Sequence, residues 1–190
     1  MLIHRDRSPS QLRQLREMTP RLFRAHPAED SVDQRSGILW PKRIVVPVRG
    51  GPVDKEALRA ACRLGRPAKA DILIVTVLEV ARNLPLSASL SDELGQAEEV
   101  LTEMEGVAAD LGAHVRTTVL QAREAGPAII DEARRWGADL MVVGLGIKPR
   151  FGEFSLGRTG AQLLSDAHCR LVLLRQALPE DLGTLPAEIT

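Results

Sequence analysis

In the sequence VVGLGIKPRFGEFSLGRTG, residues 142–160, an apolar run is followed by a glycine-rich loop. The stretch holds five glycines and three cationic side chains. Glycine lets a backbone adopt positive φ and approach a ligand closely. A helix that follows such a loop presents free N–H groups to an anion. The residues alone leave two interpretations open: a phosphate-binding loop, or a long ordered turn whose cations are solvated.

Strand and helix patterns alternate on both sides of this stretch. Five short runs are typical of strands, and the first of them, RIVVPV, is β-branched and suits a strand that is buried on both faces. These runs cover residues 43–48, 71–80, 114–121, 139–146 and 169–175. The segments between them show helical spacing. Alternation of this kind predicts right-handed crossovers and a parallel sheet, so we expect an α/β fold with a five-stranded doubly wound sheet.

The composition divides the chain into three parts. Residues 1–40 form a basic extension and linker, residues 41–176 the sheet domain, and residues 177–190 an acidic tail. Residues 1–26 carry six arginines against two acidic residues, a net charge of +4. Two interpretations of this segment stay open. It is a short helix that is packed on the domain or partly disordered, or it is a basic amphipathic arm that contacts a membrane surface or a protein partner.

Charge and cysteine content exclude several classes of protein. Basic and acidic residues number 25 each, so the whole chain offers no electrostatic case for binding nucleic acid. Cys62 and Cys169 are too few for a disulfide scaffold or a cysteine-based zinc site. The N-terminus, MLIHRDRSPS, lacks the apolar core of a signal peptide. We therefore expect a cytoplasmic protein with reduced thiols.

The sequence shows no catalytic constellation. Pro149 breaks the dinucleotide fingerprint after Gly146, and there is neither a P-loop nor a nucleophile elbow. Asp131 and Glu132 are adjacent on a predicted helix and therefore point in different directions. We expect a protein that is not an enzyme and has no metal of its own. Slow ATP hydrolysis is kept as an alternative, in which Glu153 is the one carboxylate near the glycine loop.

Four segments, in order along the chain, resemble the universal stress protein domain. They are RIVVPVRGGPVDKEAL (43–58), ILIVTVLEV (72–80), ADLMVVGLG (138–146) and LGRTGAQLLSDAHCRLVLLR (156–175). The resemblance implies a Rossmann-like parallel sheet with strand order 3-2-1-4-5. It also implies a homodimer formed through the last strand, residues 169–175. The variant VPVRGGP is similar to members that are attached to membrane transporters, which implies a regulatory role.

The resemblance also bears on nucleotide binding. Members that bind ATP use a loop of the form G-x2-G-x9-G-[ST] and an Asp after the first strand. Gly144 and Gly157 match the outer glycines, but Ile147 and Arg158 stand at the second glycine and the Ser/Thr, and Arg49 stands at the Asp. A β-branched isoleucine disfavours the positive φ that glycine allows. Arg49 in place of the Asp reverses the charge of a side chain that contacts the sugar or the base.

The resemblance therefore implies a non-enzymatic, stress-type regulatory domain that acts through dimerisation and partner binding, with a degenerate nucleotide loop. The alternative is a sensor that binds ATP, AMP or another adenine nucleotide, with Mg²⁺ as the only accompanying metal. The candidate nucleotide-binding residues are Pro47, Val48, Arg49, Gly50, Gly51, Val77, Val143, Gly144, Gly146, Lys148, Gly157, Arg158 and Thr159.

Overall fold

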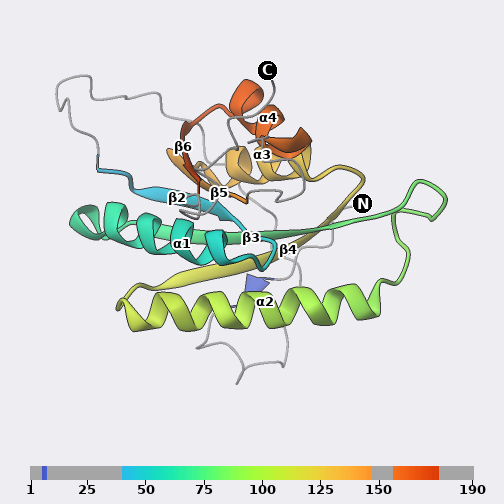
Figure 1. The fold of residues 1–190 in the computed structure, drawn as a ribbon, viewed down its shortest axis with the longest axis horizontal. Helices are drawn as coiled ribbons and strands as arrows, with labels where there is room; N and C mark the ends of the chain where they lie inside the picture. Colours follow the sequence, from blue (N-terminus) through green and yellow to red (C-terminus); the bar gives the residue numbers. More distant parts are fainter. Residues whose placement is uncertain (1–5, 8–39, 147–155, 176–190) are drawn as a thin grey trace, which may run out of the picture.

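The computed structural model describes residues 6–7, 40–146 and 156–175. In it, a six-stranded sheet lies between two pairs of helices (Figure 1). The strands are β1 (Asp6–Arg7), β2 (Arg43–Pro47), β3 (Asp71–Glu79), β4 (Val115–Ala122), β5 (Leu140–Leu145) and β6 (Arg170–Arg175). The helices are α1 (Pro52–Gly65), α2 (Ser91–Asp110), α3 (Ala125–Trp136) and α4 (Gly157–Asp166), with a short 3-10 helix, η1 (Arg66–Ala68), after α1.

The strand order is β1-β4-β3-β2-β5-β6. Strands β2 to β6 are parallel to one another. Among these five, the order confirms the predicted 3-2-1-4-5 arrangement. The chain crosses from β4 at one side of the sheet to β5 at the other, so strand order reverses between β2 and β5. The carboxyl ends of those two strands are where ligands bind in doubly wound sheets.

The short strand β1 is a feature that the sequence did not predict. It pairs antiparallel with β4, with Asp6 opposite Thr118 and Arg7 opposite Thr117. Two residues of the basic extension therefore cover the edge of β4, which would otherwise offer unpaired backbone groups. The remainder of residues 1–39, including the predicted helix, lies outside the described residues.

Each face of the sheet carries its own apolar core. Ile44, Val46, Ile74 and Val142 belong to the core under α1 and α2. Alternate residues of the same strands, such as Val45, belong to the core under α3 and α4. Side chains of a strand alternate between the two faces, so a strand that is buried on both sides must be apolar throughout. That requirement explains the continuous apolar runs of β2, β3 and β5. The edge strand β6 is also apolar between its arginines, but none of its residues is buried.

Asp139 fastens the amino ends of β2 and β5 together. Its carboxylate accepts hydrogen bonds from the backbone N–H groups of Lys42 (2.8 Å) and Arg43 (3.3 Å). The Arg43 guanidinium lies 5.9 Å from the centre of the Trp136 ring and donates to the Trp136 carbonyl oxygen at 3.0 Å. These contacts fix the register of the central strands and leave their opposite, carboxyl ends open to a functional site.

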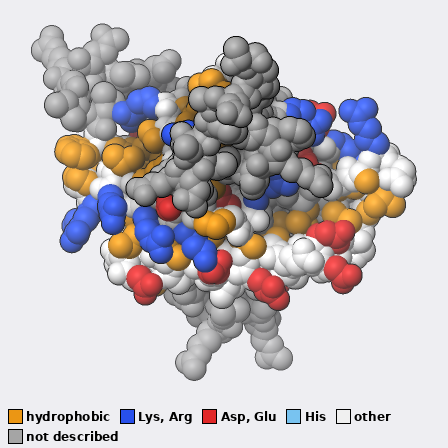
Figure 2. Space-filling model, viewed as in Figure 1, with side chains coloured by type: hydrophobic (Ala, Val, Ile, Leu, Met, Phe, Trp, Pro, Cys, Tyr) orange, Lys and Arg blue, Asp and Glu red, His pale blue; other side chains and the backbone are white. Residues whose placement is uncertain are grey.

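Charge is segregated between the two helices of one face. Figure 2 shows Lys and Arg side chains gathered over α1 and Asp and Glu side chains over α2. Lys55 of α1 and Glu103 of α2 form a salt bridge at this boundary. Both side chains are partly exposed, so the pair contributes little to stability. None of the helices in the described ranges is long and apolar enough to cross a membrane.

Candidate functional site

The candidate residues lie at the carboxyl ends of β2, β3 and β5 and at the start of α4. Pro47, Val77 and Gly144 are in these three strands, and Gly157 is the first residue of α4. Val48 and Val143 are buried, Val77 and Thr159 are half-buried, and Arg49, Gly146 and Arg158 are exposed. Lys148 lies outside the described residues, as do Ile147 and Glu153.

The carboxylate of Asp54 fills the loop between β2 and α1. Its Oδ2 atom accepts three backbone hydrogen bonds, from the N–H groups of Arg49 (2.7 Å), Gly50 (3.0 Å) and Gly51 (3.0 Å). Gly50 has φ of +95°, a value that glycine adopts without strain. Successive N–H groups that converge in this way form an anion-binding concavity. The anion bound in it is a side chain of the same protein.

Asp54 is buried, and only 6% of its surface is exposed to solvent. A buried carboxylate requires hydrogen-bond partners, and the three backbone donors supply them. These donors are the ones that a phosphate group would need in order to bind at this loop. The free energy of binding a phosphate there is therefore reduced by the cost of displacing Asp54.

Sequence reasoning missed Asp54, although a signal was available. Gly51 is the N-cap of α1, Pro52 is its first residue and Asp54 its third. An acidic residue at the third helical position is one half of a capping box, because its side chain reaches back to the backbone at the N-cap. The prediction gave weight to the glycines and to Arg49, which are compatible with an external anion, and overlooked the internal one.

Gly144 is required by the packing of β5 against α1. A Cβ atom at this position would lie 2.8 Å from the carbonyl oxygen of Val53 and 3.1 Å from Oδ1 of Asp54. The first of these neighbours is backbone and cannot rotate away. The match of Gly144 to the family's loop pattern is therefore explained by the fold itself, whether or not a nucleotide binds.

A second carboxylate, that of Glu79, lies at the start of α3. Its Oε1 atom accepts a hydrogen bond from the backbone N–H of Ala125 at 2.9 Å. The same atom is 3.8 Å from the Arg158 guanidinium of α4. The side chains of Arg158 and Glu79 are 70% and 40% exposed, so solvent screens this pair. Negative charge at a helix N-terminus is favourable, and the protein provides its own charge at this helix, as it does at α1.

These two carboxylates correct one sequence-based expectation. Glu153 was expected to be the one carboxylate near the glycine loop, but Asp54 and Glu79 both lie at the carboxyl ends of the central strands. Within the described ranges, no group of three or more His, Cys, Asp or Glu side chains could hold a metal ion. Asp131 and Glu132 diverge as predicted, since Asp131 is exposed and Glu132 is buried.

The two cysteines sit in environments that disfavour the thiolate. Burial raises the pKa of the Cys62 thiol, and backbone hydrogen bonding lowers it to a smaller extent. Burial likewise raises the pKa of Cys169 at the start of the last strand. A nucleophilic cysteine needs the opposite shift. The prediction that Cys169 is a packing residue agrees with its contact with the core under α3 and α4.

Comparison with known proteins places this geometry in a family. Residues 41–175 match the model of the universal stress protein family. A universal stress protein of Methanocaldococcus jannaschii is 26% identical over 152 residues, which are 77% of this chain and 89% of that protein. The sensor protein KdpD of Mycobacterium tuberculosis is 28% identical over 137 residues, which are 71% of this chain and 14% of that much longer protein.

The solved structures of this fold include one with a nucleotide. A universal stress protein from Archaeoglobus fulgidus, in complex with dAMP, aligns with a TM-score of 0.56 and 20% sequence identity, and the alignment covers 71% of this chain and 98% of that one. Identity at this level establishes a shared fold. Together with the family match over residues 41–175, it leads to one conclusion: the chain belongs to the universal stress protein family.

Proposed function

We propose that this protein is a non-enzymatic regulatory domain that acts through self-association and partner binding, and that its nucleotide loop has been closed from within. One observation carries the proposal: the Asp54 carboxylate accepts the three backbone hydrogen bonds at the loop after β2. An external phosphate would have to displace the buried carboxylate of Asp54 from the three backbone N–H groups that stabilise it. It would then meet that negative charge at close range.

The strand β6 supports self-association. It lies at the edge of the sheet and, among the described strands, pairs only with β5. Its sequence, RLVLLR, is apolar between two arginines, yet Val172 is 36% exposed. Leu164 of the neighbouring α4 is 55% exposed. An apolar edge strand of this kind invites pairing with another chain, and we propose a second copy of this protein as its partner.

A second candidate function is adenine-nucleotide sensing. It is favoured by the A. fulgidus relative that holds dAMP and by the start of α4, where Gly157 has φ of +64° and the Arg158 side chain is largely exposed. In this alternative, Arg158 leaves Glu79 and contacts a phosphate group. The backbone donors held by Asp54 then contribute nothing to binding, and among the described residues Arg158 supplies the charged contact.

A thermal-shift panel separates the two functions, because a ligand that binds only the folded state raises the melting temperature by mass action. The panel contains ATP, AMP and cyclic AMP at millimolar concentration, each with and without Mg²⁺. The proposal predicts no shift for any of them. A shift that is lost in Arg158→Gln but kept in Arg59→Gln, an exposed arginine on α1, would establish the sensor instead.

A further inference from the structure

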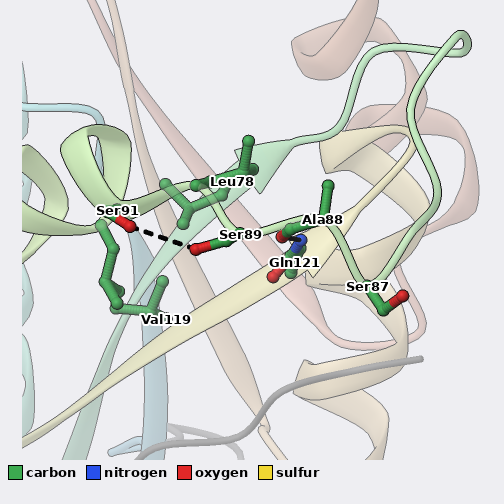
Figure 3. Close-up of a pocket in the computed structure, with 9 residues that line it drawn as sticks. Leu78, Ser87, Ala88, Ser89, Ser91, Val119 and Gln121 are labelled. Carbon is green, nitrogen blue, oxygen red and sulfur yellow. Dashed lines mark hydrogen bonds between the residues drawn. The ribbon is translucent and has the colours of Figure 1, made fainter.

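A cavity of about 460 Å³ lies on the other side of the sheet from the core of α3 and α4 (Figure 3). It is half open to solvent and is bordered by the ends of β3 and β4, the first turn of α2 and the connection that leads into α2. Its lining residues include Leu78, Ala88, Leu94, Val119 and Gln121. None of them is a candidate nucleotide-binding residue. The volume falls within the range of small-molecule sites, roughly 300–1,000 Å³.

The cavity is separate from the candidate nucleotide site, although its residue Leu78 is next to the candidate residue Val77 in the sequence. Leu78 packs with the core under α1 and α2, whereas its neighbour Val77 packs with the core under α3 and α4. Adjacent residues of a strand face opposite sides of the sheet. A molecule in the cavity therefore contacts the face opposite to Val77.

The walls of the cavity are apolar and its rim carries hydroxyl groups. Val119 is buried, and Leu78, Leu90 and Leu94 are half-buried. The serines at 87, 89 and 91 are exposed, and the hydroxyl oxygens of Ser89 and Ser91 lie 3.1 Å apart. Among the residues that the structure describes, no charged side chain lines the cavity. Such a surface suits a largely apolar, uncharged molecule.

Gln121 supplies one fixed polar group in this apolar wall. It is only 6% exposed, and its Nε2 atom donates to the carbonyl oxygens of Leu86 and Ala88, both at 2.9 Å. Two carbonyl acceptors on one side of the amide identify that side as the NH₂ group. The Oε1 atom must therefore point the other way, and Figure 3 shows the amide among the lining side chains, with its nitrogen toward Ala88.

The Oε1 atom of Gln121 accepts no hydrogen bond from the described part of the chain. This oxygen is therefore accessible from outside the protein, because every fully buried side-chain polar atom of the described residues has a hydrogen-bond partner. A ligand donor that reaches this acceptor replaces its contact with water by a hydrogen bond inside an apolar wall. The cavity thus presents one acceptor of fixed direction.

The connection over the cavity is held in place by side chains rather than by regular structure. Arg123 donates to the carbonyl oxygens of Val80 (3.2 Å), Ala81 and Leu84 (2.6 Å). Gln121 holds the following residues through Leu86 and Ala88. A wall that is fixed in advance lowers the entropy cost of binding.

We propose that this cavity binds a small, uncharged and mostly apolar molecule with one N–H or O–H group, which donates a hydrogen bond to Oε1 of Gln121. Anions are disfavoured because the lining residue Ser91 is followed directly by two acidic residues, Asp92 and Glu93, in the first turn of α2. This site does not include the loops at Asp54 and Arg158, so its test is independent of the proposed regulatory function.

The test uses two probes that differ in one donor, indole and 1-methylindole. Each is titrated into the full chain with ¹³C-labelled Leu and Val methyl groups, and binding is followed by NMR. Indole is expected to shift the methyl resonances of Leu78, Leu94 and Val119 in a saturable way. 1-Methylindole keeps the ring system but carries a methyl group in place of the N–H donor, and it is expected to bind at least tenfold more weakly.

Variants of the cavity complete the experiment. Gln121→Met should remove the preference for indole, while the same change at Gln96, an exposed residue of α2, should leave it intact. Ala88→Leu fills the cavity but keeps the backbone carbonyl that Gln121 uses, so it should weaken indole at least tenfold with an unchanged circular dichroism spectrum. Equal affinity for the two probes, shifts centred on other methyl groups, or no saturable shift at millimolar indole would overturn the proposal.

Discussion

Gly144 and Gly146 are two positions apart in the sequence, but their surroundings in the structure differ. A Cβ atom at 144 would lie 2.8 Å from the backbone of α1, whereas at 146 it would meet nothing within 4 Å. Gly144→Ala is therefore expected to destabilise the protein by about 1–3 kcal/mol, because the backbone must move to relieve the overlap. Gly146→Ala should change stability by less than about 0.5 kcal/mol. Urea unfolding measures both, and equal effects would show that the contact of β5 with α1 is not tight.

The thiols give a prediction with a pH dependence. Because burial raises the pKa of both cysteines, the folded protein retains these protons at a pH where the unfolded chain has lost them. Their contribution to stability is complete below the ordinary thiol pKa of 9.0 and declines as the pH rises above it. At pH 8 we expect slow reaction of the native protein with a disulfide reagent, with Cys169 ahead of the more deeply buried Cys62. Rapid labelling of Cys62 at pH 7 would contradict this account.

At the scale of elements, Asp139 is expected to matter more than its exposure suggests. Asp139→Ala removes the acceptors for the backbone N–H groups of Lys42 and Arg43 and should lower the free energy of unfolding by about 1–3 kcal/mol. Amide exchange at the start of β2 should become faster. The matched control is Asp131→Ala, which breaks an exposed pair with Arg134 and should cost no more than about 0.5 kcal/mol. If both variants behave alike, Asp139 does not fasten the strands.

The strands and their order could be predicted from the sequence because they are set by patterns that repeat. Burial on both faces forces apolar runs, and the alternation of runs with helices forces parallel pairing. β1 could not be predicted in this way, since two residues, Asp6 and Arg7, carry no periodicity and pair through tertiary contact alone.

The candidate site was predicted less completely, for a related reason. Glycine spacing located the loops, but the groups that fill them are the side chains Asp54 and Glu79, whose partners are backbone N–H groups at helix starts. The cavity beside Gln121 left no signal, because its walls come from β3, β4 and α2 and from a connection held by bonds between side chains and carbonyl groups. Contacts of this kind are specific to the folded chain and have no period.

For the whole molecule, the exposed edge of β6 predicts a dimer. Val172→Lys places a charge on the apolar strand and should convert the dimer to a folded monomer, because a buried unpaired lysine is unfavourable at an interface. Light scattering coupled to size-exclusion chromatography measures the change, with circular dichroism to confirm folding. Leu84→Lys alters an equally exposed leucine far from β6 along the chain and should leave the dimer intact. A wild-type protein that is monomeric at every concentration would refute self-association.

The central claim, that Asp54 closes the nucleotide loop from within, is tested most directly by calorimetric titration of ATP into three proteins. The wild type and Asp54→Asn keep an oxygen acceptor for the backbone N–H groups of Arg49, Gly50 and Gly51, so neither is expected to bind ATP at millimolar concentration. Asp54→Ala frees the three donors and removes the negative charge. It should bind ATP and inorganic phosphate at least tenfold more tightly than the wild type, provided that circular dichroism shows it folded. Micromolar binding of ATP by the wild type, with Asp54 in place, would contradict the account.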